Sequence, residues 1–194
     1  MEGLEFINDK IHQMRTEYTR LSSETDDHIF AALCVRATYF KNPSLPFNSD
    51  VIDRFLTDSV GDGGVDAILS DPTSEASDLI LCQAKHWQTI KYDDVRNAVS
   101  KMIAFYKCME RGEYEIANSK VQREFLSLNA EVGDESKVCF VLYVSATKNG
   151  IREDRIQKIL IDEGLDPSRY EISLYFINDI IEEINDLESR RPAV

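Results

Sequence analysis

Apolar and polar residues follow two different periods along the chain, and these periods predict its secondary structure. In several segments apolar residues recur every three or four positions, the spacing of a helix with one buried face. Shorter runs are almost continuously apolar and rich in β-branched or aromatic residues, which is typical of buried strands. The predicted helices cover 1–22, 24–34, 51–56, 92–114, 151–163 and 178–187, and the predicted strands cover 65–69, 79–84, 137–146 and 170–176. This order predicts an α/β domain with a central mixed sheet flanked by helices.

The first predicted helix carries an apolar seam whose members are spaced alternately by three and four residues. The seam consists of Leu4, Ile7, Ile11, Met14, Tyr18 and Leu21. It either pairs two copies of the chain into a homodimer or docks the helix on its own domain. A seam of nearly three heptads is short for a coiled coil, which favours docking.

The first two predicted strands are expected to form a β-hairpin, because a polar loop at 70–78 separates them. Side chains alternate along a strand, so Gln83 and Lys85 project from the same face of the second strand. Asp66 lies near the start of the first strand, and antiparallel pairing brings it to the end of the second. The glycine-rich segment 61–64 permits positive φ or close backbone approach just before Asp66. The sequence therefore predicts that these three side chains meet, in an arrangement that could hold a divalent metal beside a phosphodiester.

The residues of this hairpin resemble a known family of nucleases. The segment GDGGVDAI at 61–68, followed by the strand LILCQAK at 79–85, resembles the PD-(D/E)XK nuclease superfamily in its Mrr-like variant, where glutamine replaces the second acid. With His86 and Trp87 added, it is also similar to the amino-terminal part of the AIPR (abortive infection phage resistance) proteins. The resemblance implies a restriction-endonuclease-like fold, here with an extra N-terminal helix, and a metal-dependent endonuclease. The alternative is that Lys85 merely ends a buried strand and Asp66 merely follows a turn.

The resemblance implies a role for each motif residue. Asp66 would be the principal carboxylate ligand of Mg²⁺ or Mn²⁺, which are hard cations that prefer oxygen. Gln83 would add a carbonyl oxygen without charge, which weakens metal binding, so another carboxylate is expected to help. Lys85 would orient or activate the attacking water and offset charge on the phosphate. Whether Lys85 is the base stays open.

A further acid is expected on the helix before the hairpin, where members of the superfamily often place one. Asp27 fits the family spacing best, Glu24 is the second candidate, and Asp62 is a weaker one. The competing interpretation is helix capping, because Ser23 and Asp26 resemble a capping box and acids in a first turn complement the helix dipole.

The predicted helix over 92–114 offers a surface for a nucleic-acid backbone. Outside its apolar arc, Arg96, Lys107 and Arg111 fall within about 60° of one another around the helix axis. Because Lys and Arg displace counterions from phosphates, this stripe is a candidate substrate-binding face. The alternative is an ordinary solvated helix face.

Residues next to the motif are expected to extend this surface. Lys91 lies close in sequence, and His86, which leaves the strand, is expected to be a surface or substrate-contact residue. Trp87 either stacks on a base or packs against the following helix, and packing is favoured.

Composition describes a single globular domain over 1–194, with a leading helix at 1–22. The 194 residues are 43% hydrophobic and 29% charged, which is typical of a folded chain. The net charge of −13 opposes nucleic-acid binding, so non-specific affinity for DNA is expected to be poor. Because AIPR-like proteins are usually longer, the chain is either complete or the amino-terminal part of a longer protein with C-terminal partner regions.

The sequence also predicts a location. No signal peptide or long apolar run is present, which predicts a cytoplasmic protein without a membrane segment. The cysteines at 34, 82, 108 and 139 lack CxxC spacing and are expected to be reduced core thiols. Nucleotide-binding GxxxxGK[ST], HExxH and GxSxG motifs are absent.

The motif and its resemblance imply a metal-dependent nuclease that acts on DNA, and the AIPR resemblance implies a role in phage defence. The alternative is a catalytically degenerate module of the same fold that binds nucleic acid or assembles with proteins, and the neutral Gln83 favours it. DNA versus RNA, strandedness, sequence preference and oligomeric state stay open.

Overall fold

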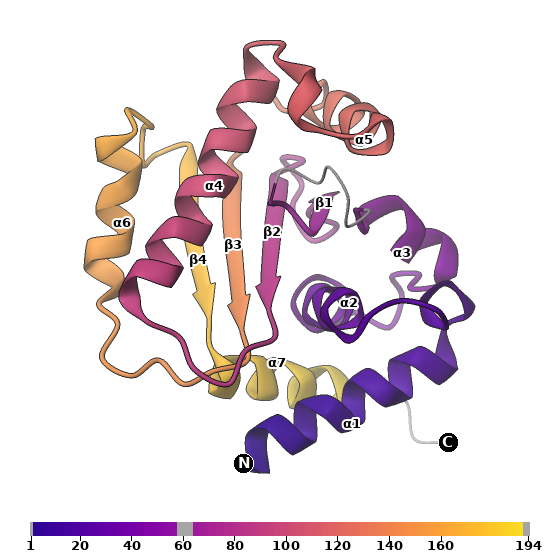
Figure 1. Ribbon diagram of the computed structural model, residues 1–194. Coiled ribbons are helices and arrows are strands. Elements are labelled where there is room, and N and C mark those ends of the chain that lie inside the picture. Colours follow the sequence, from indigo (N-terminus) through magenta and orange to yellow (C-terminus); the bar gives the residue numbers. More distant parts are fainter. Residues whose placement is uncertain (1, 58–63, 192–194) are drawn as a thin grey trace.

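The structure, a computed structural model, describes residues 2–57 and 64–191. Within these ranges the chain forms three layers, with a mixed sheet between two layers of helices (Figure 1). The α/β class predicted from the sequence is therefore confirmed. The helices are α1 (Glu2–Glu17), α2 (Asp26–Tyr39), α3 (Ser49–Phe55), α4 (Tyr92–Glu110), α5 (Ser119–Asn129), α6 (Glu153–Asp162) and α7 (Ile177–Ser189), with 3-10 turns η1 (Thr19–Leu21) and η2 (Tyr114–Ile116). The strands are β1 (Ala67–Ser70), β2 (Leu79–Lys85), β3 (Val138–Val144) and β4 (Tyr170–Tyr175).

The strands of the described chain lie in the order β1-β2-β3-β4. β1 and β2 pair antiparallel, with Ala67 opposite Cys82, so the predicted hairpin is confirmed. β3 is parallel to both β2 and β4. Every residue of β3 is buried, as expected for a strand covered on both faces.

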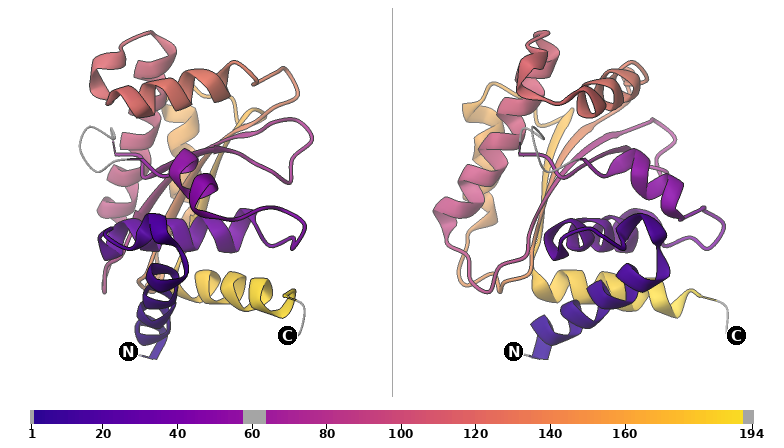
Figure 2. Two further views of the ribbon diagram at one scale, coloured as in Figure 1. Left: turned by 90° about the vertical axis from the view of Figure 1, so that its right-hand side faces the viewer. Right: turned by 45° about the vertical axis from the view of Figure 1, so that its right-hand side comes forward.

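Side-chain alternation divides the core into two halves, one on each face of the sheet. On one face Ile80, Cys82 and Val141 pack against α1, α2, α3 and α7. On the other face Leu81 and Leu142 pack against α4, α5 and α6. Figure 2 shows the sheet edge-on between these two layers. Because Leu79, Leu81, Gln83 and Lys85 alternate with the first group along β2, Gln83 and Lys85 belong to the α4 face.

The apolar seam of the first helix is buried within the chain itself. Ile7, Ile11 and Met14 on α1, with Tyr18 and Leu21 beyond it, join the core formed with α2 and α7. The docking interpretation of this seam is confirmed.

Several predicted helix boundaries are wrong. α1 ends at Glu17 and not at 22, and α2 continues to Tyr39 and does not end at 34. α2 is capped by Thr25, whose side chain accepts a hydrogen bond from the backbone N–H of His28, so the expected capping box at Ser23 does not form. α4 ends at Glu110 because Gly112, with φ of +77°, reverses the chain in the left-handed region.

One helix was not predicted. α5 is short and largely exposed, burying only Val121 and Phe125. Its sequence signal was the side chain of Asn118, which caps the helix by accepting from the N–H of Val121 at 2.9 Å. The spacing of the two buried residues by four is the other signal.

Three of the four cysteines lie in the core as expected, whereas Cys108 is only partly buried. All four cysteines are free thiols, and those at 34, 82 and 139 are buried. In the described part of the chain, no helix combines the length and the apolar character needed to cross a membrane.

Candidate functional site

Asp66 is fixed where the regular pairing of the hairpin ends. Its backbone N–H donates to the carbonyl of Cys82 at 2.7 Å, and its carbonyl accepts from the N–H of Thr57 at 3.0 Å. Its carboxylate oxygen Oδ2 accepts from the backbone N–H of Ala84 at 2.8 Å. Ala84 lies between Gln83 and Lys85, so the hairpin brings the three motif residues together at the end of β2.

Gln83 is a buried polar residue on this strand, with 5% of its surface exposed. Its carbonyl oxygen Oε1 is buried and accepts no hydrogen bond from any residue in the described ranges. Such an orphaned acceptor costs free energy in a folded protein, which makes Gln83 the first candidate for contact with a ligand.

Gly64 and a residue of α4 lie close to the side chain of Gln83. Gly64 has φ of +82°, and a Cβ atom placed on it would lie 3.8 Å from Gln83 Nε2 and 3.6 Å from Lys101 Cβ. The stem of Lys101 therefore lies beside Gly64 and close to Gln83. Lys101 is exposed and makes no ion pair with any residue the structure describes.

The sequence does not single out Lys101, because the cationic stripe that it predicts on this helix contains Arg96. Lys101 lies about 140° around the helix from Arg96 and so belongs to the opposite flank of α4. The signal that could have found it is the contact between α4 and the glycine before Asp66, which only the tertiary structure supplies.

Lys85 is the last residue of β2 and is partly buried. Its backbone carbonyl accepts from the N–H of Ser145 at 3.0 Å, which extends the pairing with β3. Its ammonium lies 5.2 Å from the centre of the Trp87 ring, in a cation–π contact.

His86 connects the end of β2 to α2. Its ring lies 5.2 Å from that of Phe30, and its Nδ1 is 3.8 Å from Oδ1 of Asp27. Its Nε2 is buried and has no hydrogen-bond partner within residues 2–57 and 64–191. Asp27, whose side chain is 75% exposed, therefore approaches the motif through His86.

Glu24, the second candidate acid, belongs to a network of ion pairs. Its carboxylate binds Nδ1 of His28 at 2.7 Å and also the guanidinium of Arg20. Burial raises the pKa of Glu24, but the hydrogen bonds from His28 and Arg20 outweigh burial and leave the pKa below its ordinary value.

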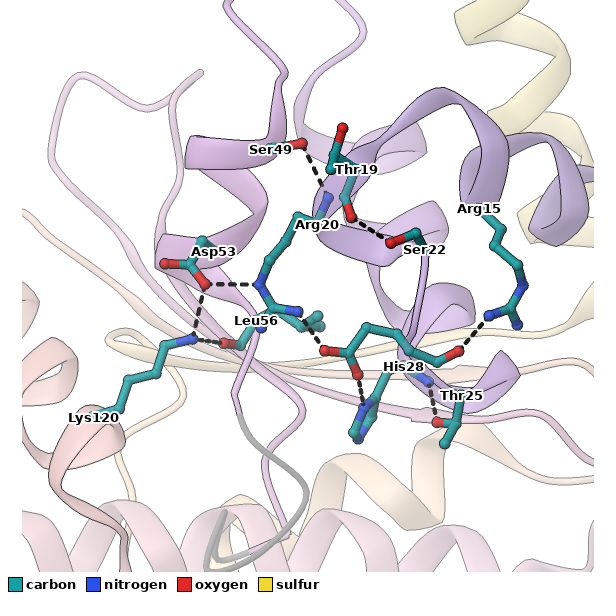
Figure 3. Close-up of polar contacts among 11 residues, drawn as sticks. Arg15, Thr19, Arg20, Ser22, Thr25, His28, Ser49, Asp53, Leu56 and Lys120 are labelled. Carbon is teal, nitrogen blue, oxygen red and sulfur yellow. Dashed lines mark hydrogen bonds and ion pairs between the residues drawn. The ribbon is translucent and has the colours of Figure 1, made fainter.

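The same network continues to α3 and α5. Arg20 Nε donates to Asp53 at 2.7 Å, and this bond lowers the pKa of Asp53. Lys120 lies 3.8 Å from Asp53 and donates to the carbonyl of Leu56 at 2.7 Å (Figure 3). Leu56 forms a bridge with Ala67, so the network supports the start of β1.

The predicted cationic stripe on α4 is partly neutralised by the chain itself. Lys107 donates to Glu163 Oε2 at 2.8 Å, and Arg111 donates to Glu113 at 3.0 Å. Arg96 and Lys91 are exposed and form no ion pair in the described part of the chain. Arg111 lies about 15 Å further along the helix axis than Lys101, so the stripe extends away from the motif.

The donor set at the end of β2 suits a hard divalent cation. The carboxylate of Asp66 and the orphaned carbonyl of Gln83 are both oxygen donors, the type that Mg²⁺ and Mn²⁺ prefer. No group of three or more His, Cys, Asp or Glu side chains gathers as a metal site in the ranges that the structure describes. Asp62, the weaker candidate, lies outside the described residues.

Comparison with known proteins gives no relative: no family model matches the chain, and neither a curated protein nor a solved structure matches it. Any functional conclusion therefore rests on the residues themselves.

Proposed function

We propose that the protein is a metal-dependent nuclease that hydrolyses phosphodiester bonds, with DNA as the expected substrate and phage defence in the cytoplasm as the expected setting. The observation that supports this proposal is the orphaned carbonyl of Gln83, which lies on the strand whose backbone holds the carboxylate of Asp66 in place. A carbonyl oxygen without a hydrogen-bond donor can bind a cation, and the carboxylate of Asp66 would supply the negative charge.

Asp66 and Gln83 would hold Mg²⁺ or Mn²⁺ through oxygen atoms. When bound, the cation would supply Lewis-acid polarisation of the phosphate and neutralise charge that develops on it. The bond from Ala84 N–H orients the carboxylate of Asp66, which reduces the entropy lost when it binds a ligand.

Lys85 would hold the substrate phosphate from the same strand. Its side chain starts from the strand, and its ammonium lies over the face of Trp87. A cation held there would bind a phosphate oxygen and attract charge that increases in the transition state.

The proposal is tested by cleavage of plasmid DNA, single-stranded DNA and RNA with Mg²⁺ or Mn²⁺ at low salt. Lys85→Ala is expected to lower the rate by at least about 100-fold, because it removes a preorganised cation from the reacting phosphate. Asp66→Asn keeps an acceptor for Ala84 N–H but loses the charge, and is expected to lose both cleavage and stabilisation by the metal. Lys158→Ala removes an exposed lysine of α6 and should cut like the unmodified chain.

Equal cutting by the unmodified protein and Lys85→Ala would contradict the proposal. So would identical thermal stabilisation of the unmodified protein and Asp66→Asn by metal.

The second candidate function is a catalytically degenerate module that binds nucleic acid or assembles with proteins. It is favoured by the neutral Gln83 and by a total charge of −13, which is unfavourable for phosphate binding. Metal-independent binding of nucleic acid without any cleavage would support this candidate over the enzyme.

A further inference from the structure

Trp87 is the chain's only tryptophan and lies just beyond the proposed catalytic strand. It keeps 41% of its surface exposed, and it is the only aromatic side chain among the large apolar residues that the described part of the chain exposes. The expected packing on the following helix thus leaves much of the ring open to solvent.

The ring of Trp87 lies beside Lys85, the residue proposed to bind the substrate phosphate. The ammonium of Lys85 lies 5.2 Å from the ring centre, so a phosphate bound by Lys85 would carry its nucleotide next to Trp87. The carbonyl of Trp87 accepts from Ser145 Oγ at 2.8 Å, which anchors the segment that presents the ring.

A hollow of about 470 Å³ adjoins the same segment. Ser145, which bonds Trp87, forms part of its wall, and Gln88 directly follows Trp87 in the chain. The exposed lining of the hollow is mainly apolar. It also contains amide and hydroxyl groups, which can donate to and accept from the edges of bases, on Gln88, Thr89, Ser145, Thr147 and Asn178.

We propose that Trp87 is a stacking platform for an unpaired base, so that the substrate of this site is single-stranded nucleic acid. Bases of a duplex stack on one another and present only their edges, whereas an unpaired base can place its face on an aromatic ring. The inference rests on the proposed function, because it takes Lys85 at the end of β2 as the residue that binds the substrate phosphate. The binding itself requires no cleavage.

The charge of the chain favours the same substrate. A net charge of −13 opposes the binding of any nucleic acid, and it opposes duplex more than single strands because a neutralised duplex phosphate releases more counterions. Stacking on an indole ring supplies affinity that is independent of phosphate neutralisation.

The test uses the fluorescence of this single tryptophan. The full chain is titrated with single-stranded DNA, single-stranded RNA and duplex DNA of equal length, with a chelator present so that nothing is cut. Single strands are expected to quench the emission saturably, and duplex is expected to quench it much less. A difference between the DNA and RNA arms identifies which single strand the site prefers.

Variants test whether the ring carries the affinity. Trp87→Ala is expected to weaken binding of a labelled single strand, measured by anisotropy, by about tenfold, the effect of losing one stacked base. Trp87→Phe keeps an aromatic face and should lose less. Leu126→Ala truncates an apolar side chain of similar exposure, 44%, on α5, and should bind as the unmodified chain does.

Three results would overturn the inference: no quenching by single strands, equal quenching by duplex, or unchanged single-strand binding by Trp87→Ala. Quenching without cleavage in Mg²⁺ or Mn²⁺ would contradict the proposed nuclease and leave the base platform standing. Cleavage without quenching would do the reverse.

Discussion

Two groups of polar residues lie near the open end of the hairpin, where β1 starts and β2 ends. They differ in how completely their polar atoms are paired. In the ion-pair network of Figure 3, Arg20 joins Glu24 to Asp53, His28 binds Glu24, and Lys120 binds a backbone carbonyl. At the end of β2, by contrast, Gln83 Oε1 and His86 Nε2 are buried without hydrogen-bond partners in the described ranges.

This contrast distinguishes polar atoms that are paired within the fold from buried polar atoms that are available to a ligand. A buried polar atom that is fully paired contributes to stability, whereas an unpaired one costs free energy and is retained where something else can bind it. The paired network holds α2, α3 and α5 around the start of β1, and the unpaired atoms lie where the resemblance expects a ligand. Substitutions should therefore have opposite effects on stability in well-paired and unpaired positions.

The largest such effect is expected for Gln83→Leu, compared with Gln157→Leu. In the metal-free protein, Gln83→Leu should raise the free energy of unfolding by about 1 kcal/mol, because it replaces a buried amide whose oxygen is unsatisfied with an apolar group of similar size. Gln157 Nε2 donates to the carbonyl of Ile172 at 2.8 Å, so Gln157→Leu should lower it by about 1 kcal/mol. Urea denaturation with a chelator measures both.

Added metal provides a second comparison of Gln83→Leu with Gln157→Leu. Added Mg²⁺ or Mn²⁺ should stabilise the unmodified protein and Gln157→Leu equally, and Gln83→Leu less. If Gln83→Leu is destabilising without metal, its carbonyl has a partner in solution, and the argument for a ligand there fails.

A smaller effect is expected from acid on the paired network. The pKa of Glu24 lies below the ordinary value of 4.5, since hydrogen bonds from His28 and Arg20 outweigh the effect of burial. A carboxylate with a lowered folded-state pKa stabilises the protein above its unfolded-state value, and this stabilisation is lost as pH falls through the folded-state pKa. Glu24→Gln should therefore flatten the decline of unfolding free energy below about pH 4.5.

The size of this change is expected to be about 1 kcal/mol or less, as for partly exposed ion pairs. Unfolding free energies measured by urea at successive pH values check it. Glu115→Gln removes an exposed carboxylate that has no ion pair in the described chain, and should leave the acid limb unchanged. A Glu24→Gln curve parallel to that of the unmodified protein would show that the network adds no stability.

The sequence predicted a helix or strand more accurately the more apolar surface the element buries. β3 is apolar on both faces and was found within a residue or two of its bounds, as was the hairpin. α5 buries only two side chains along its length, so its periodicity was too weak to detect. The capping residue of α2 was misplaced because several neighbouring residues, Ser23 among them, could accept the same bonds.

The candidate site was predictable where it depends on strand geometry, and not where it depends on helix packing. Alternation and antiparallel pairing sufficed to bring Asp66 to Gln83 and Lys85. The rotation of α4 about its axis is set by packing against the sheet, so the sequence could not tell which flank meets the motif. That rotation turns Lys101 toward Gly64, and places Lys107 within reach of Glu163.

The smallest expected effect compares these two lysines of α4. Lys101 has no ion pair with the described residues, whereas the ammonium of Lys107 already binds Glu163. If Lys101 faces a substrate phosphate, Lys101→Gln should weaken binding of single-stranded DNA a few-fold and reduce the slope of log affinity against log salt by about one phosphate contact. Lys107→Gln should change neither quantity as much, because its charge is already neutralised. Anisotropy titrations at several salt concentrations, with a chelator present, measure both variants. A larger loss in Lys107→Gln than in Lys101→Gln would move the backbone-binding face to the stripe of Arg96, Lys107 and Arg111, and so would assign substrate contact to the flank of α4 that the sequence alone indicates.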